Sequence, residues 1–220
     1  MIDSSNDFAF FTHDDLLKMD KLQRSNFVNC LSGYKSANLV GTTDGRIENL
    51  AVISSVVHIG ANPPFLGMVL RPHTVPRHTL ENIKQTGQYT INAIDASWYE
   101  KAHQTAARYP KEVSEFDAVA LTPWYSQGLI APYVCESKIK IGLQVAEITP
   151  IHCNNTQLVV GKIDEVYVDA HAIAEDGMLD LPVMDIACIS GLDTYHRPQM
   201  LARLSYAKPD TPTKRLSANS

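Results

Sequence analysis

The clearest hydrophobic pattern lies in the C-terminal half of the chain, between residues 135 and 168. Aliphatic residues occupy every second position at its start: Ile139, Ile141, Leu143 and Val145. This period of two is typical of a strand that buries one face. Asn154-Asn155 interrupts the pattern, and Asn favours turns because its side chain bonds to nearby backbone. The pattern therefore predicts a long antiparallel hairpin whose return strand covers residues 158–168.

Shorter apolar runs rich in Val and Ile precede this hairpin. They predict strands over residues 38–43, 51–59, 65–70 and 88–94. Asp44-Gly45 separates the first two as a turn, because glycine adopts positive φ without a Cβ clash. Pro63-Pro64 ends the second run.

A period near 3.6 occurs in only a few places. Residues 14–31 predict a first helix with Thr12 as its cap, and residues 78–87 predict a second with Thr79 at or near its N-cap. Ser97 and Glu100 have the spacing of a capping box, which predicts a third helix ending before Pro110. A short turn is expected near Glu115.

Many strands with few short helices indicate a mainly β protein (α+β), an antiparallel barrel with helices at its ends. A doubly wound parallel sheet is disfavoured, because long helices do not separate the strands regularly. We find no internal repeat and no low-complexity linker. We therefore predict a single domain over residues 1–206, followed by a polar, flexible tail over residues 207–220.

Charge and composition narrow the possible partners. The 220 residues carry 24 acidic and 19 basic side chains, a formal net charge of −5, so nothing global attracts nucleic acid or anionic lipid. No apolar run approaches the roughly 20 residues that span a bilayer, and no basic leader precedes one. A cytoplasmic protein without membrane contact is expected.

Metal and cysteine chemistry are also disfavoured by spacing. The four cysteines lie far apart and form no CxxC pair, so we expect isolated, buried thiols. The eight histidines are scattered, and the sequence contains no HExxH. We expect no metal site. GxGxxG, GxxxxGK[ST] and GxSxG are absent as well, which leaves the common nucleotide loops and the serine nucleophile elbow unsupported.

One short segment concentrates basic residues just ahead of a predicted helix. Arg71, His73, Arg77 and His78 all precede Thr79 within nine positions. Guanidinium forks, a hydroxyl and the free N–H groups of a helix N-terminus are the donors that hold a phosphate. The serines at positions 54 and 55 could add hydroxyl donors from the neighbouring strand. The same composition also suits a solvated basic loop, and spacing does not separate the two readings.

Motifs in a fixed order carry a resemblance to a known family. They are Asn49-Leu50-Ala51-Val52-Ile53-Ser54, Pro63-Pro64, Thr79-Leu80-Glu81-Asn82-Ile83 and Gly87-Gln88-Tyr89-Thr90-Ile91-Asn92. In this order they resemble the flavin reductase-like family of FMN-binding split β-barrels, and the likeness extends over residues 20–205. The chain departs from many relatives at Val52, where they have proline, and at His78, where they have an acidic residue.

The resemblance implies a Greek-key split barrel that works as a homodimer, with FMN in a groove between the protomers. It implies main-chain contacts to the flavin ring from Asn49, Leu50, Ala51, Val52, Ile53, Ser54 and Ser55. Phosphate and ribityl contacts would come from Ser54, Ser55, Arg71, Arg77, His78 and Thr79. Tyr195 and His196 would approach the flavin from a C-terminal segment, although a packing role suits both.

The implied activity is hydride transfer from NAD(P)H to the flavin. The cofactor does the difficult electronic work in such chemistry, so we assign no catalytic residue. The resemblance also suggests a monooxygenase as a possible partner. Two alternatives stay open: a flavoprotein that holds FMN for electron transfer or sensing without NAD(P)H activity of its own, and a barrel with an empty site that serves as an interaction dimer.

Overall fold

The predicted long hairpin is the longest element of the protein. A computed structural model describes residues 8–72 and 77–216 of the chain. In it β9 (Ile139–Ile151) and β10 (Thr156–Val168) are antiparallel strands of 13 residues each. Asn155 lies in the turn with φ 59°, the left-handed region that asparagine tolerates. Two register shifts interrupt the pairing, and such bulges bend and twist a strand pair. The hairpin prediction is confirmed.

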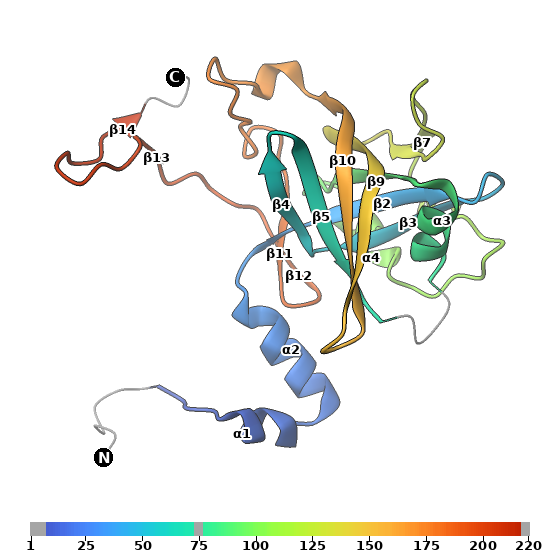
Figure 1. The fold of residues 1–220 in the computed structure, drawn as a ribbon, viewed down its shortest axis with the longest axis horizontal. Helices are drawn as coiled ribbons and strands as arrows, with labels where there is room; N and C mark the ends of the chain where they lie inside the picture. The colour runs from blue at the N-terminus through green and yellow to red at the C-terminus, as the bar shows by residue number, and fades with distance from the viewer. Residues whose placement is uncertain (1–7, 73–76, 217–220) are drawn as a thin grey trace.

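Seven antiparallel strands form the main sheet in the order β3-β2-β6-β9-β10-β5-β4. Besides β9 and β10, they are β2 (Asn38–Thr43), β3 (Glu48–Ile53), β4 (Val56–Ala61), β5 (Pro64–Leu70) and β6 (Gln88–Ala93). Strands β3 and β4 are separated by only Ser54 and Ser55, yet they lie at opposite ends of this order. A sheet whose first and last strands are two residues apart must curve round into a barrel that stays open between them. Figure 1 shows this curved sheet.

The prediction of one strand over residues 51–59 is wrong, because the barrel opens within this segment and divides it between β3 and β4. The chain leaves β3 at Ser54, and β4 begins at Val56. The backbone N–H of Val69, on β5, donates to the Ser55 carbonyl at 3.3 Å. Apolar residues flank both serines, so local pattern did not mark this break.

A buried cluster fills the barrel beneath α3 (His78–Thr86). Its buried members are Val40, Met68, Leu80, Ile83, Tyr89, Ile91, Leu143 and Val159. Gly87 ends the helix with φ 70°, as predicted. The N-cap is Arg77 rather than Thr79, and its side chain makes no capping bond. The hydroxyl of Thr79 instead donates a hydrogen bond to Asn49 Oδ1 on strand β3.

A second buried cluster lies against the outside of β2 and β3. It packs α4 (Tyr99–Gln104) and α5 (Glu115–Val119) against the small sheet of β1 (Lys35–Ser36), β11 (Cys188–Ser190) and β12 (Thr194–His196). The predicted capping box at Ser97 is wrong. Its hydroxyl donates to Asp95, and the helix begins after Trp98, which makes no side-chain capping bond. Elsewhere β7 (Pro123–Trp124) pairs with β8 (Tyr133–Val134), and a 3₁₀ turn, η1, spans Ala170–Ala172.

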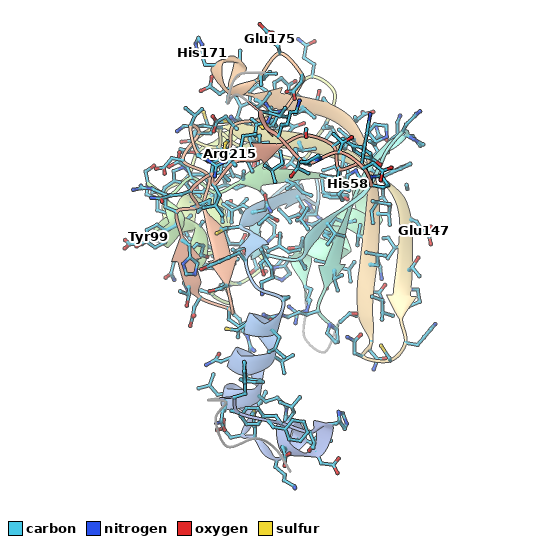
Figure 2. All side chains as sticks on the ribbon, turned by 90° about the vertical axis from the view of Figure 1, so that its left-hand side faces the viewer. His58, Tyr99, Glu147, His171, Glu175 and Arg215 are labelled. Carbon is cyan, nitrogen blue, oxygen red and sulfur yellow. The ribbon has the colours of Figure 1, made fainter. Side chains whose placement is uncertain are left out.

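The N-terminal helices project away from the barrel (Figures 1 and 2). The predicted single helix is divided into α1 (His13–Lys18) and α2 (Lys21–Leu31). Thr12 caps α1 as expected, whereas Asp20 breaks the run by accepting from two N–H groups of α2. Neither helix contains a buried residue. The exposed apolar side chains of this arm are Phe8, Phe10, Phe11, Leu17, Leu22, Val28 and Leu31.

The C-terminal segment also leaves the barrel. Strands β13 (Arg203–Leu204) and β14 (Arg215–Leu216) form a small hairpin that crosses the predicted domain boundary at residue 206. The flexibility of residues 207–220 stays a prediction.

The expectation of buried thiols is wrong. Cys30, Cys135 and Cys153 are exposed, and Cys188 is half-buried. Over the described ranges, no helix is both long and apolar enough to cross a bilayer.

Candidate functional site

Strand β3 is an edge strand of the main sheet, with its only strand partner in the described chain on the β2 side. An edge strand presents backbone N–H and C=O groups that no neighbouring strand uses. Of the predicted ring-contacting segment, residues 49–55, Asn49 and Leu50 are buried, whereas residues 51–55 are all half-buried. The main-chain groups on the unpaired side of β3 thus belong to half-buried residues where the strand ends at the barrel opening. These groups could bind the polar edge of a planar ligand.

The side chain of Asn49 is used inside the protein. Its Oδ1 accepts from the Thr79 hydroxyl at 2.8 Å and from the Thr42 hydroxyl at 3.3 Å. Its Nδ2 donates to Glu115 Oε2 at 2.8 Å. Asn49 therefore connects β3 to the first turn of α3 and to α5. The predicted contact of Asn49 with a ligand is through its main chain, and it stays a prediction.

Glu115 holds the start of β3 from the outside. Its Oε2 accepts from the Leu50 backbone N–H at 2.9 Å as well as from Asn49, and the residue is 5% exposed. Burial raises the pKa of Glu115, while its hydrogen bonds with Leu50 and Asn49 and the proximity of His78 act in the opposite direction. Sequence reasoning predicted only a turn here. The pairing spans 65 residues, so no local signal could identify it.

The two serines at the barrel opening differ. The Ser55 hydroxyl donates to the Val69 carbonyl at 2.6 Å, which ties the β3–β4 connection to β5. Its hydrogen is therefore used within the protein. Ser54 is half-buried, and its predicted role as a hydroxyl donor stays a prediction.

Three arginines from two distant segments form a cationic cluster near the N-terminus of α3. The half-buried Arg77 donates from Nε to the Pro72 carbonyl at 3.0 Å. Burial, followed by the neighbouring charges of Arg71 and Arg108, lowers the pKa of Arg77. Across residues 8–72 and 77–216, none of the three arginines forms an ion pair with a carboxylate. We call Arg71, Arg77 and Arg108 the arginine cluster.

Sequence reasoning selected Arg71 and Arg77 because they lie in one short segment, but it missed Arg108. His73, which was counted in the same basic segment, lies outside the described residues.

A small cavity adjoins the cluster, between the β2–β3 turn, α3 and the loop after α4. Its lining residues are Asp44, Ile47, Glu48, Asn49, His78, Asn82, Lys111 and Val113. His78 thus faces this cavity beside Lys111. The predicted His78 and Thr79 lie on the same first turn of α3, one at the cavity and one bonded to Asn49.

The two C-terminal candidates have different surroundings. Tyr195 packs against the buried cluster that contains Leu50, as does Val52. Its hydroxyl lies 3.2 Å from His103 Nδ1, and burial, together with the nearby charge of Asp193, raises the pKa of Tyr195 to about 12. His196 bonds through Nε2 to the Ser190 hydroxyl at 2.8 Å and packs edge-on against Tyr34. Of the two candidates, Tyr195 is therefore the residue that packs against the same buried cluster as β3.

The donor set suits an organic anion better than a metal. In the described part of the chain, no three His, Cys, Asp or Glu side chains gather as metal ligands. Guanidinium groups, a helix N-terminus and an open strand edge instead match a phosphate joined to a planar polar ring. A flavin mononucleotide has this combination, so the residues present fit the implied cofactor.

Comparison with known proteins agrees with this geometry. Residues 31–184 match the model of the flavin reductase like domain. A split-barrel protein of Shewanella frigidimarina NCIMB 400, provisionally assigned as a flavin reductase, is 48% identical, with a TM-score of 0.88 over 91% of this chain and 100% of that chain. Nitrilotriacetate monooxygenase component B of Bacillus cereus is 19% identical, with a TM-score of 0.80 over 91% of this chain and 100% of that one.

Curated relatives match over shorter stretches. An uncharacterised protein of Aquifex aeolicus is 27% identical over 48% of this chain and 55% of its own length. Another, from Halalkalibacterium halodurans, is 24% identical over 61% of this chain and 66% of its own length. The matches thus span between about half and two thirds of these relatives.

Proposed function

Because the chain belongs to the flavin reductase-like family of split barrels, we propose that it binds FMN and transfers hydride to it from NAD(P)H. The observation that carries the proposal is the position of the arginine cluster, at the N-terminus of the helix whose Thr79 bonds to Asn49 on the open edge strand. A phosphate at the arginines would leave the flavin ring within reach of the main chain of residues 51–55. One nucleotide would use both features.

The protein's part in this reaction is to bind and orient. Arg77 and Arg71 would neutralise the phosphate through charge-assisted hydrogen bonds, and the free N–H groups at the start of α3 would add donors. The hydrogen bonds of Glu115 and Asn49 fix β3 against α3 and α5, which sets the distance between phosphate and ring sites. A bound flavin supplies the hydride-accepting chemistry, and the residues of this chain hold it without a side-chain acid or base.

A homodimer belongs to the same proposal. The described part of the helical arm, residues 8–31, has no buried residue, although it carries seven exposed large apolar side chains. Helices of 6 and 11 residues are marginal in water without a packing partner. A second copy of the chain would cover the arm. The reduced flavin would then pass its electrons to a separate acceptor, and we propose a monooxygenase component for that role.

An anaerobic titration tests the function. We expect the purified protein to bind FMN and bleach its absorption near the visible flavin maximum on addition of NADH or NADPH. A protein that binds no added FMN would contradict the proposal entirely.

A second candidate, a flavoprotein for electron transfer or sensing, has a different signature in the same titration. It would bind FMN and accept electrons from dithionite, but it would oxidise neither nicotinamide.

A further inference from the structure

The segment that follows β12 buries none of its residues. We call residues 198–216 the C-terminal arm. Only Arg203 and Ser205 of this arm are half-buried, and the rest are exposed. Figure 1 shows its hairpin, β13 and β14, standing away from the barrel. Because a two-stranded hairpin is marginally stable alone in water, the arm needs a surface to pack on.

Ion pairs fix the base of the arm but do not cover its apolar side chains. Arg197, just before the arm, lies with Nε 2.5 Å from Asp185 Oδ1, and Arg203 pairs with Asp176. Such exposed pairs contribute little to stability. The exposed large apolar side chains of the arm are Met200, Leu201, Leu204, Tyr206 and Leu216.

The C-terminal arm and the helical arm leave the protein from one small sheet. Strand β1 follows the end of α2, β12 leads into the C-terminal arm, and β11 lies between the two strands. Lys35 on β1 donates to the Asn29 carbonyl of α2 at 2.9 Å and to the Gly191 carbonyl of the β11–β12 turn at 3.1 Å. Figure 1 shows the two arms diverging from this region. A protein seated against the sheet would therefore lie between the arms.

The exposed surface is large for a compact monomer. The protein exposes 13807 Å², whereas a compact protein of 24.3 kDa exposes roughly 10,000 Å². Permanent homodimers bury about 2,000–5,000 Å² from both partners together, and transient redox encounters bury less than about 1,200 Å². The excess on one protomer is therefore ample for a permanent second copy and exceeds what a passing electron acceptor would use.

Charge also favours a second copy as the partner of the C-terminal arm. The arm carries four basic side chains and one acidic side chain, a net charge of +3. The whole chain carries −5, so the remaining residues carry −8. The arm of one protomer and the body of another therefore have opposite charges, and opposite charges favour association.

We propose that the C-terminal arm clasps a second copy of the chain. Each protomer presents its own arm and receives that of its partner, because a two-fold interface uses the same surface on both copies. The arm leaves from β12, whose Tyr195 packs against the same buried cluster as Val52. A copy held there adjoins the ring-contacting end of β3. On the basis of the proposed function, FMN affinity therefore depends on the clasp.

Substitutions in the full-length chain test the clasp. Leu201 and Tyr206 are 95% and 89% exposed, so Leu201→Glu and Tyr206→Glu leave the core of a protomer untouched. Gln199→Glu adds the same charge at another exposed residue of the arm and is the matched control. Light scattering during size-exclusion chromatography over a dilution series measures the dissociation constant of the dimer. Fluorescence quenching measures FMN affinity at protein concentrations below and above that constant.

We expect a dimeric wild type. Leu201→Glu and Tyr206→Glu should each raise the dissociation constant of the dimer at least tenfold, because each places a carboxylate without a partner in an apolar contact. Gln199→Glu should stay within twofold of the wild type. In Leu201→Glu, FMN affinity should fall at protein concentrations where the dimer has dissociated and recover where it reforms.

A monomeric wild type overturns the clasp. A wild-type dissociation constant in both Leu201→Glu and Tyr206→Glu overturns it too, and leaves the proposed function and a dimer held by the helical arm intact. An equal loss in Gln199→Glu also overturns it, because charge rather than apolar contact would then be responsible. Undiminished FMN affinity in the dissociated variant overturns the dependence of the flavin site on the clasp. A wild type that binds no FMN contradicts the proposed function, while the mass measurement still decides the clasp.

Discussion

Asn49 Nδ2 donates a hydrogen bond of 2.8 Å to Glu115 Oε2, and this bond joins the edge strand β3 to helix α5 across 66 residues of sequence. The other side of the same amide accepts from Thr79 on α3. One buried asparagine therefore sets the position of β3 relative to both helices. Because the phosphate and ring sites lie on α3 and β3, the geometry of the proposed flavin site depends on this pair.

Stability should fall with rising pH through Glu115. Burial raises its folded-state pKa above the ordinary value of 4.5, so the unfolded chain loses this proton first as pH rises. The free energy of unfolding should decrease between the ordinary pKa and the raised one, and then level off. Glu115→Gln has no proton to lose in this pH range. Urea unfolding of both proteins from pH 4 to 8 should show the wild type losing stability relative to the variant. A constant difference would contradict the prediction.

The strands were predictable because their signal is local. Residues 38–43, 65–70 and 88–94 alternate or run apolar between turn residues, and each became a strand of the barrel. The break at Ser54-Ser55 was not predictable in this way. Both serines can continue a strand, and the chain leaves β3 there only because its continuation pairs with β5 at the other end of the sheet.

The residues of the candidate site were predictable from the sequence only where they lie close together in it. Arg71, Arg77 and Thr79 are close in sequence, so their composition could suggest an anion site without a structure. Arg108 and Glu115 reach the same region from other elements. Their contributions depend on the packing of α4 and α5 against β3, which no spacing in the sequence encodes.

Gly41 allows two backbones to approach closely. A Cβ at this position of β2 would collide with the Pro132 carbonyl and the Thr90 hydroxyl, which are hydrogen-bonded to each other at 2.6 Å. Gly41→Ala should therefore lower the free energy of unfolding by about 1–3 kcal/mol, the usual cost of overpacking. Gly60→Ala is the matched control, because its added carbon would come no nearer than 3.4 Å to the Pro63 carbonyl. Equal urea midpoints for the two variants would be inconsistent with this reasoning.

The helical arm should bind a second copy of the chain. Leu22 is 69% exposed on α2, so a charge there costs an isolated protomer little. If the arm packs on a partner, Leu22→Glu buries an unpaired carboxylate, and the dimer should dissociate at least tenfold more readily. Light scattering during size-exclusion chromatography measures the mass over a dilution series. Gln23→Glu, which adds the same charge at the next exposed residue, should leave the mass unchanged. A monomeric wild type would refute the dimer.

Arg77 should determine the affinity for the flavin phosphate. It is half-buried at the N-terminus of α3, held by its bond to the Pro72 carbonyl, and free of any carboxylate partner in the described chain. Loss of a charge-assisted hydrogen bond costs about 1.5–3 kcal/mol. Arg77→Ala should therefore weaken FMN binding roughly 10- to 150-fold.

Riboflavin separates this effect from a change in the ring site, because it has the same ring without the phosphate. Its dissociation constant should stay within about twofold of the wild-type value in Arg77→Ala, since no charge-assisted bond is lost. Fluorescence quenching measures both ligands on the same protein. Unchanged FMN affinity would place the phosphate away from the arginine cluster. Equal losses for FMN and riboflavin would mean that Arg77 supports the fold of the site rather than the phosphate.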